Sequence, residues 1–369
     1  MSEEKLTIVT HIFNECYLLP FWLKHHKRLF DFGIVVDYNS NDGSMDIVRE
    51  ICPDWEVRPS INKYYSRPTL EPELVEIEKS LTGWKTILNV TEFIFHPDIR
   101  TYLRTLSPNV KGVWMPPISL IDDDPDNPLN TEMPLVLQKN YGTIGKNEVR
   151  PTNRLIHRNS HGEWKGEGRH DSYMSNTFIA NDLYHVWFGW CPWRPEFLKR
   201  KLQIQDKMSS EYKTGKAIEE VGYHITTEEK LNKDFEKIHN AHCKNLFRDP
   251  VYELLYKEIE KSYNDENYKF NPFLFQDKAE YNMQRIVSQL KSTGNEYLLI
   301  VKDAKTKNSL FSVDVNSNFD PAEFLQSVFQ NLAKWVGLRL KPWNLRMVVM
   351  DKKRNLPIAD SELIKNEEK

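Results

Sequence analysis

Two stretches near the start of the 369-residue chain decide the fold class: residues 6–15, LTIVTHIFNE, and residues 34–44, IVVDYNSNDGS. Each begins with apolar, mostly β-branched residues and ends in polar ones, as a buried strand does where it runs into a loop. Between them, Leu19, Trp22 and Leu23 follow the spacing of one helix face. The sequence therefore predicts a strand, a helix and a second strand in succession.

Residues typical of helix ends flank this helix. Asn14 is a favourable N-cap residue, and Glu15 would lie at the positive end of the helix dipole. Gly33 is expected to close the helix. His25 and His26 stand beside two basic residues and are expected on the helix surface.

Strands and helices continue to alternate after this opening, which is typical of a parallel sheet with helices on both faces. Ligands of such sheets bind beyond the carboxyl ends of the strands. Asn14, Asp37, Asn89 and Glu92 each stand just beyond an expected strand and should converge there. The further expected strands cover residues 55–57, 85–88 and 112–115, and the further expected helices cover residues 44–51, 74–81 and 97–106.

Composition excludes several classes of protein. Hydrophobic residues make up 40% and charged residues 28%, which argues against a largely disordered chain. The net charge of −3 gives no basic excess for coating nucleic acid. The four cysteines are widely spaced and predict reduced thiols rather than a zinc ribbon or disulfides. We see no signal peptide and no apolar stretch of membrane-spanning length, so a cytoplasmic protein without an integral membrane segment is expected.

Three blocks in this order resemble the family 2-like glycosyltransferases, which have the GT-A fold. They are residues 10–15 (THIFNE), residues 36–44 (VDYNSNDGS) and residues 83–93 (GWKTILNVTEF). The resemblance extends over residues 6–231. It implies transfer of a sugar from a nucleotide-diphosphate donor to a glycan or polysaccharide acceptor, with inversion at the anomeric carbon, in polysaccharide biosynthesis.

The resemblance also implies which residues bind the donor. Asp37 would contact the uracil or ribose, since a carboxylate can accept two hydrogen bonds from a diol. Its alternative role is to cap the turn that follows. Asn14 and Glu15 would line the same pocket, and Thr10 enters through the resemblance alone. The complete donor-binding set implied in this way is Thr10, Asn14, Glu15, Asp37, Asn89 and Glu92.

The chain departs from the family at the metal-binding motif. Where the family carries Asp-x-Asp, this chain has Asn89-Val90-Thr91, followed by Glu92. Mg²⁺ and Mn²⁺ prefer charged oxygen ligands, and Asn89 and Thr91 offer only neutral ones. Three alternatives stay open: weak metal binding, replacement of the lost charge by Glu92 and residues elsewhere, or a reaction without metal. The candidate metal ligands are Glu92 and His224.

Arg169-His170-Asp171 follows a glycine-rich stretch and is the candidate catalytic segment. An inverting transfer needs a general base for the acceptor hydroxyl, and Asp171 or His170 could serve. Arg169 could stabilise the leaving diphosphate, because a guanidinium matches phosphate geometry. The alternative is an exposed surface loop.

Two further clusters invite a structural interpretation. The acidic turn at residues 122–126 is expected to be a solvated loop rather than a metal site. The aromatic residues between 184 and 193 are expected mainly in the core, although aromatic faces can also stack on a sugar. Lys201, which follows Arg200 on a helix, could meet a phosphate.

The expected organisation is a GT-A-like domain over residues 1–231, a helical extension over 232–291 and a small ββαβ module over 292–369. We expect residues 118–151 to be rich in loops and residues 195–290 to be mainly helical. The final module should contain strands at 297–301, 310–315 and 345–350 and a helix at 321–336.

Two competing functions are considered. A nucleotidyltransferase of similar sheet topology usually carries a glycine-rich basic loop after its first strand, and residues 10–15 contain no glycine. The alternative that the altered Asp-x-Asp motif supports is a degenerate GT-A domain, which binds a sugar nucleotide or scaffolds a partner without catalysis.

Overall fold

The computed structural model describes residues 4–64, 67–104, 106, 110–144, 153–165, 168–180, 182–208, 226–241, 243–270, 296–303, 309–315, 345–352 and 356–364. The chain divides into two compact units. The first unit contains Met1–Arg104, Trp114–Met174 and Leu183–Phe270, and the second contains Thr105–Val113, Ser175–Asp182 and Asn271–Lys369. The three-domain division expected above stays a prediction.

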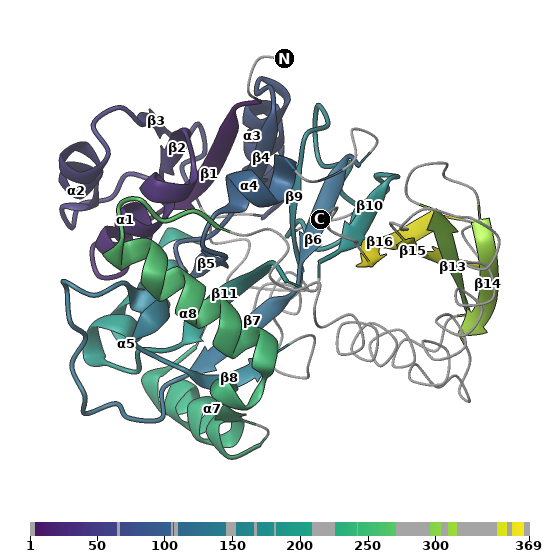
Figure 1. The fold of residues 1–369 in the computed structure, drawn as a ribbon. Helices are drawn as coiled ribbons and strands as arrows, with labels where there is room; N and C mark the ends of the chain where they lie inside the picture. Colours follow the sequence, from purple (N-terminus) through teal and green to yellow (C-terminus); the bar gives the residue numbers. More distant parts are fainter. Residues whose placement is uncertain are drawn as a thin grey trace. The chain divides into compact units, whose positions relative to one another are not determined.

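A mixed, largely parallel sheet organises the amino-terminal half of the chain (Figure 1). β1 pairs in parallel with β2 and with β4, and β2 pairs in parallel with β3, whereas β9 runs antiparallel to β4. The protein is therefore an α/β protein, as the sequence predicted. The strand order is β10-β6-β9-β4-β1-β2-β3. The bounds are β1 Leu6–Ile12, β2 Phe32–Asp37, β3 Glu56–Pro59, β4 Trp84–Ile87, β6 Gly112–Met115, β9 Arg154–His157 and β10 Thr177–Ile179.

Burial of both faces explains the near-continuous apolar runs of β1 and β2. Val9 packs in one cluster with Ile34 and with Leu74 and Ile77 of α3, while the alternate residue Ile8 is also fully buried. The helices of this part are α1 Leu19–Leu29, α2 Ser44–Ile51, α3 Arg67–Lys79 and α4 Ile99–Arg104.

Both expected ends of the first helix are wrong. α1 starts at Leu19, and Asn14 lies in the preceding loop with a positive φ of 52°. The helix ends at Leu29, and Gly33 lies inside β2. A Cβ at Gly33 would stand 2.1 Å from the Trp55 ring, so this glycine admits a tryptophan against the strand rather than ending a helix.

His25 and His26 are buried, contrary to the expected surface position. His25 is bonded at Nε2 to the carbonyl oxygen of Ile94 and at Nδ1 to the Tyr263 hydroxyl, both at 2.7 Å. Burial lowers the pKa of His25 to about 4 and that of His26 well below its ordinary value. Neutral imidazoles with satisfied nitrogens fit an interior that a charged pair would not.

A second sheet of five strands has the order β12-β8-β7-β11-β5. Two of its strands and a 3-10 helix fall within residues 118–151, so the loop-rich expectation there is wrong in part. The strand expected at residues 85–88 is β4, which ends at Ile87, whereas β5, which starts at Glu92 in the second sheet, was not expected. The bounds are β5 Glu92–Phe95, β7 Pro117–Ile121, η1 Leu135–Leu137, β8 Tyr141–Ile144, β11 Tyr184–Trp190 and β12 Lys244–Asn245.

Helices dominate the described residues that follow β11, as expected. Asp249 caps α8 by accepting hydrogen bonds from the backbone nitrogens of Val251 and Tyr252, and Pro250 starts the helix. The bounds are α5 Pro195–Leu202, η2 Gln203–Lys207, α7 Glu228–Ala241, η5 Leu246–Arg248 and α8 Pro250–Asn264.

The second unit contains an antiparallel sheet of order β14-β13-β15-β16. Three of these strands were expected, and β16 was not. The helix expected at residues 321–336 lies outside the described residues. The bounds are β13 Tyr297–Asp303, β14 Ser309–Val315, β15 Leu345–Asp351 and β16 Leu356–Ile364.

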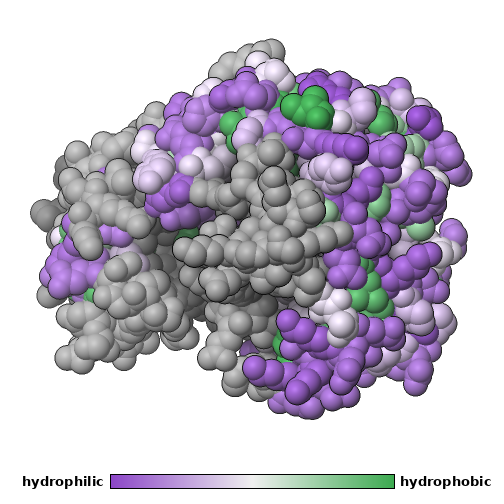
Figure 2. All heavy atoms as spheres, turned by 180° about the vertical axis from the view of Figure 1, so that it is seen from behind, coloured by the Kyte–Doolittle hydropathy of each residue, from purple (hydrophilic) through white to green (hydrophobic). Residues whose placement is uncertain are grey.

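The surface seen in Figure 2 is mainly hydrophilic over the coloured residues, with hydrophobic residues in small separate groups. Within the part of the chain that the structure describes, no helix combines the length and apolar character that crossing a bilayer requires. Cys16, Cys52, Cys191 and Cys243 form no disulfide bond.

Candidate functional site

Hydrogen bonds join the loops that follow β1 and β2 into one wall at the carboxyl edge of the sheet. The backbone nitrogens of Asn14 and Glu15 donate to the hydroxyls of Ser40 and Ser44, at 3.0 and 2.9 Å. The backbone nitrogen of Cys16 donates to the Asp42 carboxylate at 2.9 Å. The Ser-x-Asp-x-Ser turn therefore binds the Asn-Glu loop, and this explains why the two motifs occur together.

Asp37 and Asn14 lie side by side in this wall. Asp37 pairs with Ile12 in the register of β2 with β1. Its carboxylate accepts from the backbone nitrogen of Ser40, with both oxygens within 3.3 Å, and Asn14 Oδ1 accepts from the backbone nitrogen of Asn41 at 2.8 Å. Both side chains are half-buried, and the Asp37 carboxylate keeps lone pairs for a ligand. The turn-capping role and a ligand-binding role of Asp37 are thus compatible.

Glu15 and Thr10 are placed more deeply. Both Glu15 oxygens pair with Arg200 of α5, including a 2.7 Å bond from Nη2 to Oε1. Burial raises the pKa of Glu15, and the Arg200 guanidinium opposes that effect. Thr10 is fully buried, so its hydroxyl is out of reach of a ligand in this conformation. Glu15 thus anchors α5 to the end of β1.

Glu92 forms a buried ion pair with Arg154 at the start of β9. Arg154 Nε and Nη2 both donate to Glu92 Oε1, at 2.8 and 2.6 Å, and the backbone nitrogen of Asn89 donates to Oε2 at 2.9 Å. Burial alone would raise the pKa of Glu92, but the charge and hydrogen bonds of Arg154 lower it to about 2. Both carboxylate oxygens therefore have partners.

Arg154 also holds the candidate catalytic segment. Its Nη1 donates to the carbonyl oxygen of Gly168 at 2.7 Å and to His170 Nδ1 at 3.2 Å. Since a guanidinium only donates, His170 Nδ1 is the acceptor and the neutral ring carries its proton on Nε2. Arg169 pairs with Glu71 of α3, and Arg169 Nε is buried without a partner among the described residues. This segment is therefore tied to β5 and to α3.

The rest of the glycine-rich loop is braced against α3 by Glu78. This carboxylate accepts from His157 Nε2 and from the backbone nitrogen of Gly162, both at 2.7 Å. Asp171 lies on the outside, with 62% of its side chain exposed and a 3.0 Å ion pair to Lys165. Asp171 therefore remains accessible to an acceptor hydroxyl.

A half-buried histidine, His11, and a buried one, His185, complete the polar cluster around Glu92 and Arg154. Burial lowers the pKa of His11 to about 3 and that of His185 to about 4, so both are neutral near pH 7. His185 Nδ1 donates to the carbonyl oxygen of Met115 at 3.0 Å. In the described parts of the chain, His11 Nδ1 and His185 Nε2 have no hydrogen-bond partner.

The sequence reading missed Arg154 and Arg200 as members of this site. One feature of the sequence could have indicated an arginine partner: a carboxylate that is buried at a strand end requires a cation beside it. Pairing between strands distant in sequence brings Arg154 to Glu92, and that pairing has no local signature.

The residues at the Asp-x-Asp position do not fit a divalent cation. The side chains of Val90 and Thr91 are buried, and both Glu92 oxygens are occupied by Arg154 and the Asn89 nitrogen. Among the described residues, no group of three His, Cys, Asp or Glu side chains could hold a metal ion. His224, the other predicted ligand, lies outside the described residues.

The acidic turn differs from the expected solvated loop at its first residue. Asp122 is fully buried and pairs with Lys139, and its Oδ2 accepts from the backbone nitrogen of Trp193 at 2.7 Å. Asp123, Asp124 and Asp126 are exposed or half-buried, as expected. The turn therefore supports the segment that leads into α5.

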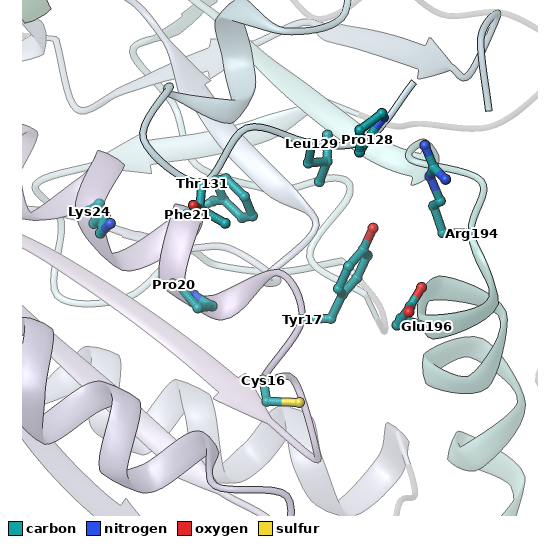
Figure 3. A pocket seen from close by; sticks show the side chains of 10 residues that line it. All are labelled: Cys16, Tyr17, Pro20, Phe21, Lys24, Pro128, Leu129, Thr131, Arg194 and Glu196. Atoms are coloured by element: carbon teal, nitrogen blue, oxygen red, sulfur yellow. The ribbon is translucent and has the colours of Figure 1, made fainter. Parts of the chain in front are cut away.

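A pocket of about 420 Å³ opens immediately after Glu15 (Figure 3). Tyr17 and Phe21 supply aromatic walls, and Arg194 supplies a guanidinium whose Nη2 has no partner within the described chain. Burial raises the pKa of Tyr17 to about 12, so its hydroxyl stays protonated. The remaining lining residues are Cys16, Pro20, Lys24, Pro128, Leu129, Thr131 and Glu196.

The arrangement defines an α/β protein with polar side chains gathered at the carboxyl edge of its parallel strands. No protein-family model and no curated protein matches the chain. Among solved structures it is similar to Staphylococcus aureus TarS 1–349 in complex with UDP-GlcNAc, with 12% identity over 72% of this chain and 94% of that one and a TM-score of 0.30. Full TarS gives 8% identity over 97% and 77%, with a TM-score of 0.26.

A cytidylyltransferase from Leptospira borgpetersenii serovar Hardjo-bovis is also similar, with 13% identity and a TM-score of 0.22. That match covers 31% of this chain, and the chain spans 54% of the cytidylyltransferase. All three likenesses are distant, with at most 13% identity and TM-scores of 0.30 or less.

Proposed function

We propose that this chain is a glycosyltransferase that binds a nucleotide-diphosphate sugar at the carboxyl edge of β1, β2 and β4. One observation carries the proposal: the hydrogen-bonded wall formed by the loops after β1 and β2, which presents Asp37 beside Asn14. Asp37 accepts hydrogen bonds from the ribose diol or the base, and Asn14 lines the same surface. Carboxyl edges of parallel strands are where ligands of open α/β sheets bind.

The proposed reaction is a direct displacement that inverts the anomeric carbon. The acceptor oxygen forms a bond to that carbon while the bond to the diphosphate oxygen breaks, and the diphosphate retains the electron pair. Asp171 is the better general base, because it is exposed, whereas His170 Nδ1 already accepts from Arg154. Arg169 lies in the same segment, but it is 3% exposed and paired with Glu71, so it holds the segment in place rather than contacting the diphosphate.

We assign the acceptor to the pocket beside Tyr17 and Phe21. Their rings offer faces for stacking on a sugar, and the pocket begins at Cys16, next to the wall that contains Asn14 and Glu15. The acceptor class is a glycan or polysaccharide hydroxyl. The four cysteines without disulfide bonds are consistent with work in the reducing cytoplasm.

Titration with UDP- and GDP-sugars, each with Mn²⁺ or with EDTA, tests the donor class, and release of nucleotide tests turnover. Asp37→Asn should weaken nucleotide binding about tenfold, the range of one hydrogen bond to a charged group. Asp171→Asn should lower kcat by about 10²–10⁴-fold and leave nucleotide affinity unchanged. Absence of binding by every nucleotide sugar, by the folded protein, would refute the proposal.

A second candidate function is a sugar-nucleotide-binding protein without transferase activity. The observation that favours it is the neutral Asn89-Val90-Thr91 turn, with Glu92 held by Arg154 rather than available to a metal. Saturable donor binding with no nucleotide release, in the presence of a panel of glycan acceptors, would select this function over the first.

A further inference from the structure

The segment formed by α5 and η2 is clamped to the end of β1. Arg200 pairs with both oxygens of Glu15, and Gln203 Nε2 donates to the carbonyl oxygen of Asn14 at 2.8 Å. A charge-assisted, two-point ion pair fixes both position and orientation. The side chains of Lys201 and Lys207, on the same segment, are therefore held near the strand edge.

Both lysines lie against aromatic rings instead of carboxylates. Lys201 Nζ is 4.4 Å from the centroid of the Trp190 ring and 5.4 Å from that of Phe197. Lys207 Nζ is 4.4 Å from the centroid of the Phe13 ring, at the end of β1. Neither ammonium forms an ion pair with any residue that the structure describes. The rings supply cation–π attraction and leave the hydrogen-bond donors of each ammonium for another group.

Keeping the ammonium group protonated costs more free energy at Lys201 than at Lys207. Burial lowers its pKa to about 7, and the neighbouring Arg200 charge acts in the same direction. A methionine would fill the same space against Trp190 and Phe197 without that desolvation cost. A half-buried ammonium without an ion pair is a candidate binding group for an anion.

Trp190 ends β11, the strand that pairs with β5 directly after the turn that replaces the Asp-x-Asp motif. β11 runs antiparallel to β5, with Trp187 opposite Glu92. The backbone nitrogen of Phe188 donates to the carbonyl oxygen of Thr91 at 2.7 Å, and Trp190, two residues further on, lies opposite Ile121 of β7. The turn itself offers no charged oxygen to a metal, because Glu92 is taken by Arg154.

We propose that Lys201, seated on Trp190, supplies the positive charge that neutralises the donor diphosphate, in the place where related chemistry uses a divalent cation. The inference rests on the proposed function and adds the statement that binding is independent of metal. During transfer, the oxygen of the departing diphosphate gains negative charge as its bond to the anomeric carbon breaks, and the ammonium stabilises that charge.

The test uses two probes, UDP and inorganic pyrophosphate, in EDTA and in Mn²⁺, measured by calorimetry on the full chain. Wild-type protein should bind both probes in EDTA, within about twofold of the Mn²⁺ values. Lys201→Met should weaken both about 10- to 100-fold, the range of one hydrogen bond to a charged group. Lys201→Arg keeps the charge and should recover most of the affinity. Lys199→Met is the matched control, because Lys199 is exposed on the same helix.

The outcomes separate this inference from the proposed function. Binding of UDP by wild-type protein only when Mn²⁺ is present would overturn the role of Lys201 while leaving a nucleotide site in place. Unchanged affinity of Lys201→Met would do the same. Failure of wild-type protein to bind either probe under both conditions would refute the nucleotide site itself. Thermal melting should show Lys201→Met at least as stable as wild type, so that lost binding cannot be ascribed to unfolding.

Discussion

Replacing Arg154 by methionine should destabilise the first unit strongly at neutral pH. The side chains of Arg154 and Glu92 are 6% and 5% exposed, so the variant would leave a carboxylate in the interior without its cation. Removing one partner of a buried pair typically costs about 3–5 kcal/mol. The pKa of Glu92 gives a similar size: a fall from 4.5 to about 2 corresponds to about 3 kcal/mol at about 1.4 kcal/mol per unit.

The loss of stability in Arg154→Met should depend on pH, and its direction follows from the pKa of Glu92. In wild-type protein the pKa of Glu92 is lowered, so its contribution to stability is complete above the unfolded value and is lost only as pH falls toward about 2. In Arg154→Met, burial without the guanidinium should raise that pKa above 4.5. The folded variant then takes up a proton that the unfolded chain does not, so its deficit should shrink as pH falls from about 7 to about 5.

Urea denaturation followed by tryptophan fluorescence at both pH values measures the effect. Arg49→Met is the control, since Arg49 and Asp46 form an exposed ion pair that should contribute less than about 1 kcal/mol. Adding Glu92→Gln to Arg154→Met removes the buried charge and should recover a large part of the loss. A deficit no larger than that of the control, or one that stays constant between the two pH values, would refute the assignment of Glu92 as a buried, Arg154-dependent carboxylate.

Three further predictions concern the strand edge and its supports. Gly33→Ala should destabilise the fold by about 1–3 kcal/mol, because the added methyl would stand 2.1 Å from the Trp55 ring. In a denaturation experiment, adding Trp55→Leu should restore part of the lost stability. Arg200→Ala should release α5 from Glu15 and weaken UDP binding at least about tenfold, more than the exposed control Arg49→Ala; equal effects in calorimetry would contradict the clamp. UDP binding should weaken as pH rises above about 7, because burial and Arg200 lower the pKa of Lys201 to about 7 and only the protonated ammonium attracts a diphosphate. Proton uptake on binding, measured as a dependence of the binding heat on the buffer, checks this prediction. It would be excluded if the affinity of wild-type protein were independent of pH and equal to that of Lys201→Met.

The sequence was sufficient for features that depend on local chemistry. The apolar runs of β1 and β2 predicted a buried parallel sheet, because strands covered on both faces cannot alternate polar and apolar residues. The polar residues after those strands predicted where Asn14 and Asp37 lie, because parallel strands end at one edge. Segment ends were less predictable: Gly33 belongs to β2 because it must admit the Trp55 ring, a contact between residues far apart in the chain.

Tertiary structure alone decided which charges meet. Whether Glu92 was available to a metal depended on Arg154, 62 residues away, and the pairing of β9 with β4 that brings them together leaves no trace in either segment. Whether Glu15 was free depended in the same way on Arg200. Burial lowers the pKa of both His25 and Lys201, because the free energy of a charge depends on the solvent and partners around it. Motifs mark the positions of candidate groups along the chain, while the surrounding packing determines which of those groups remain free to act.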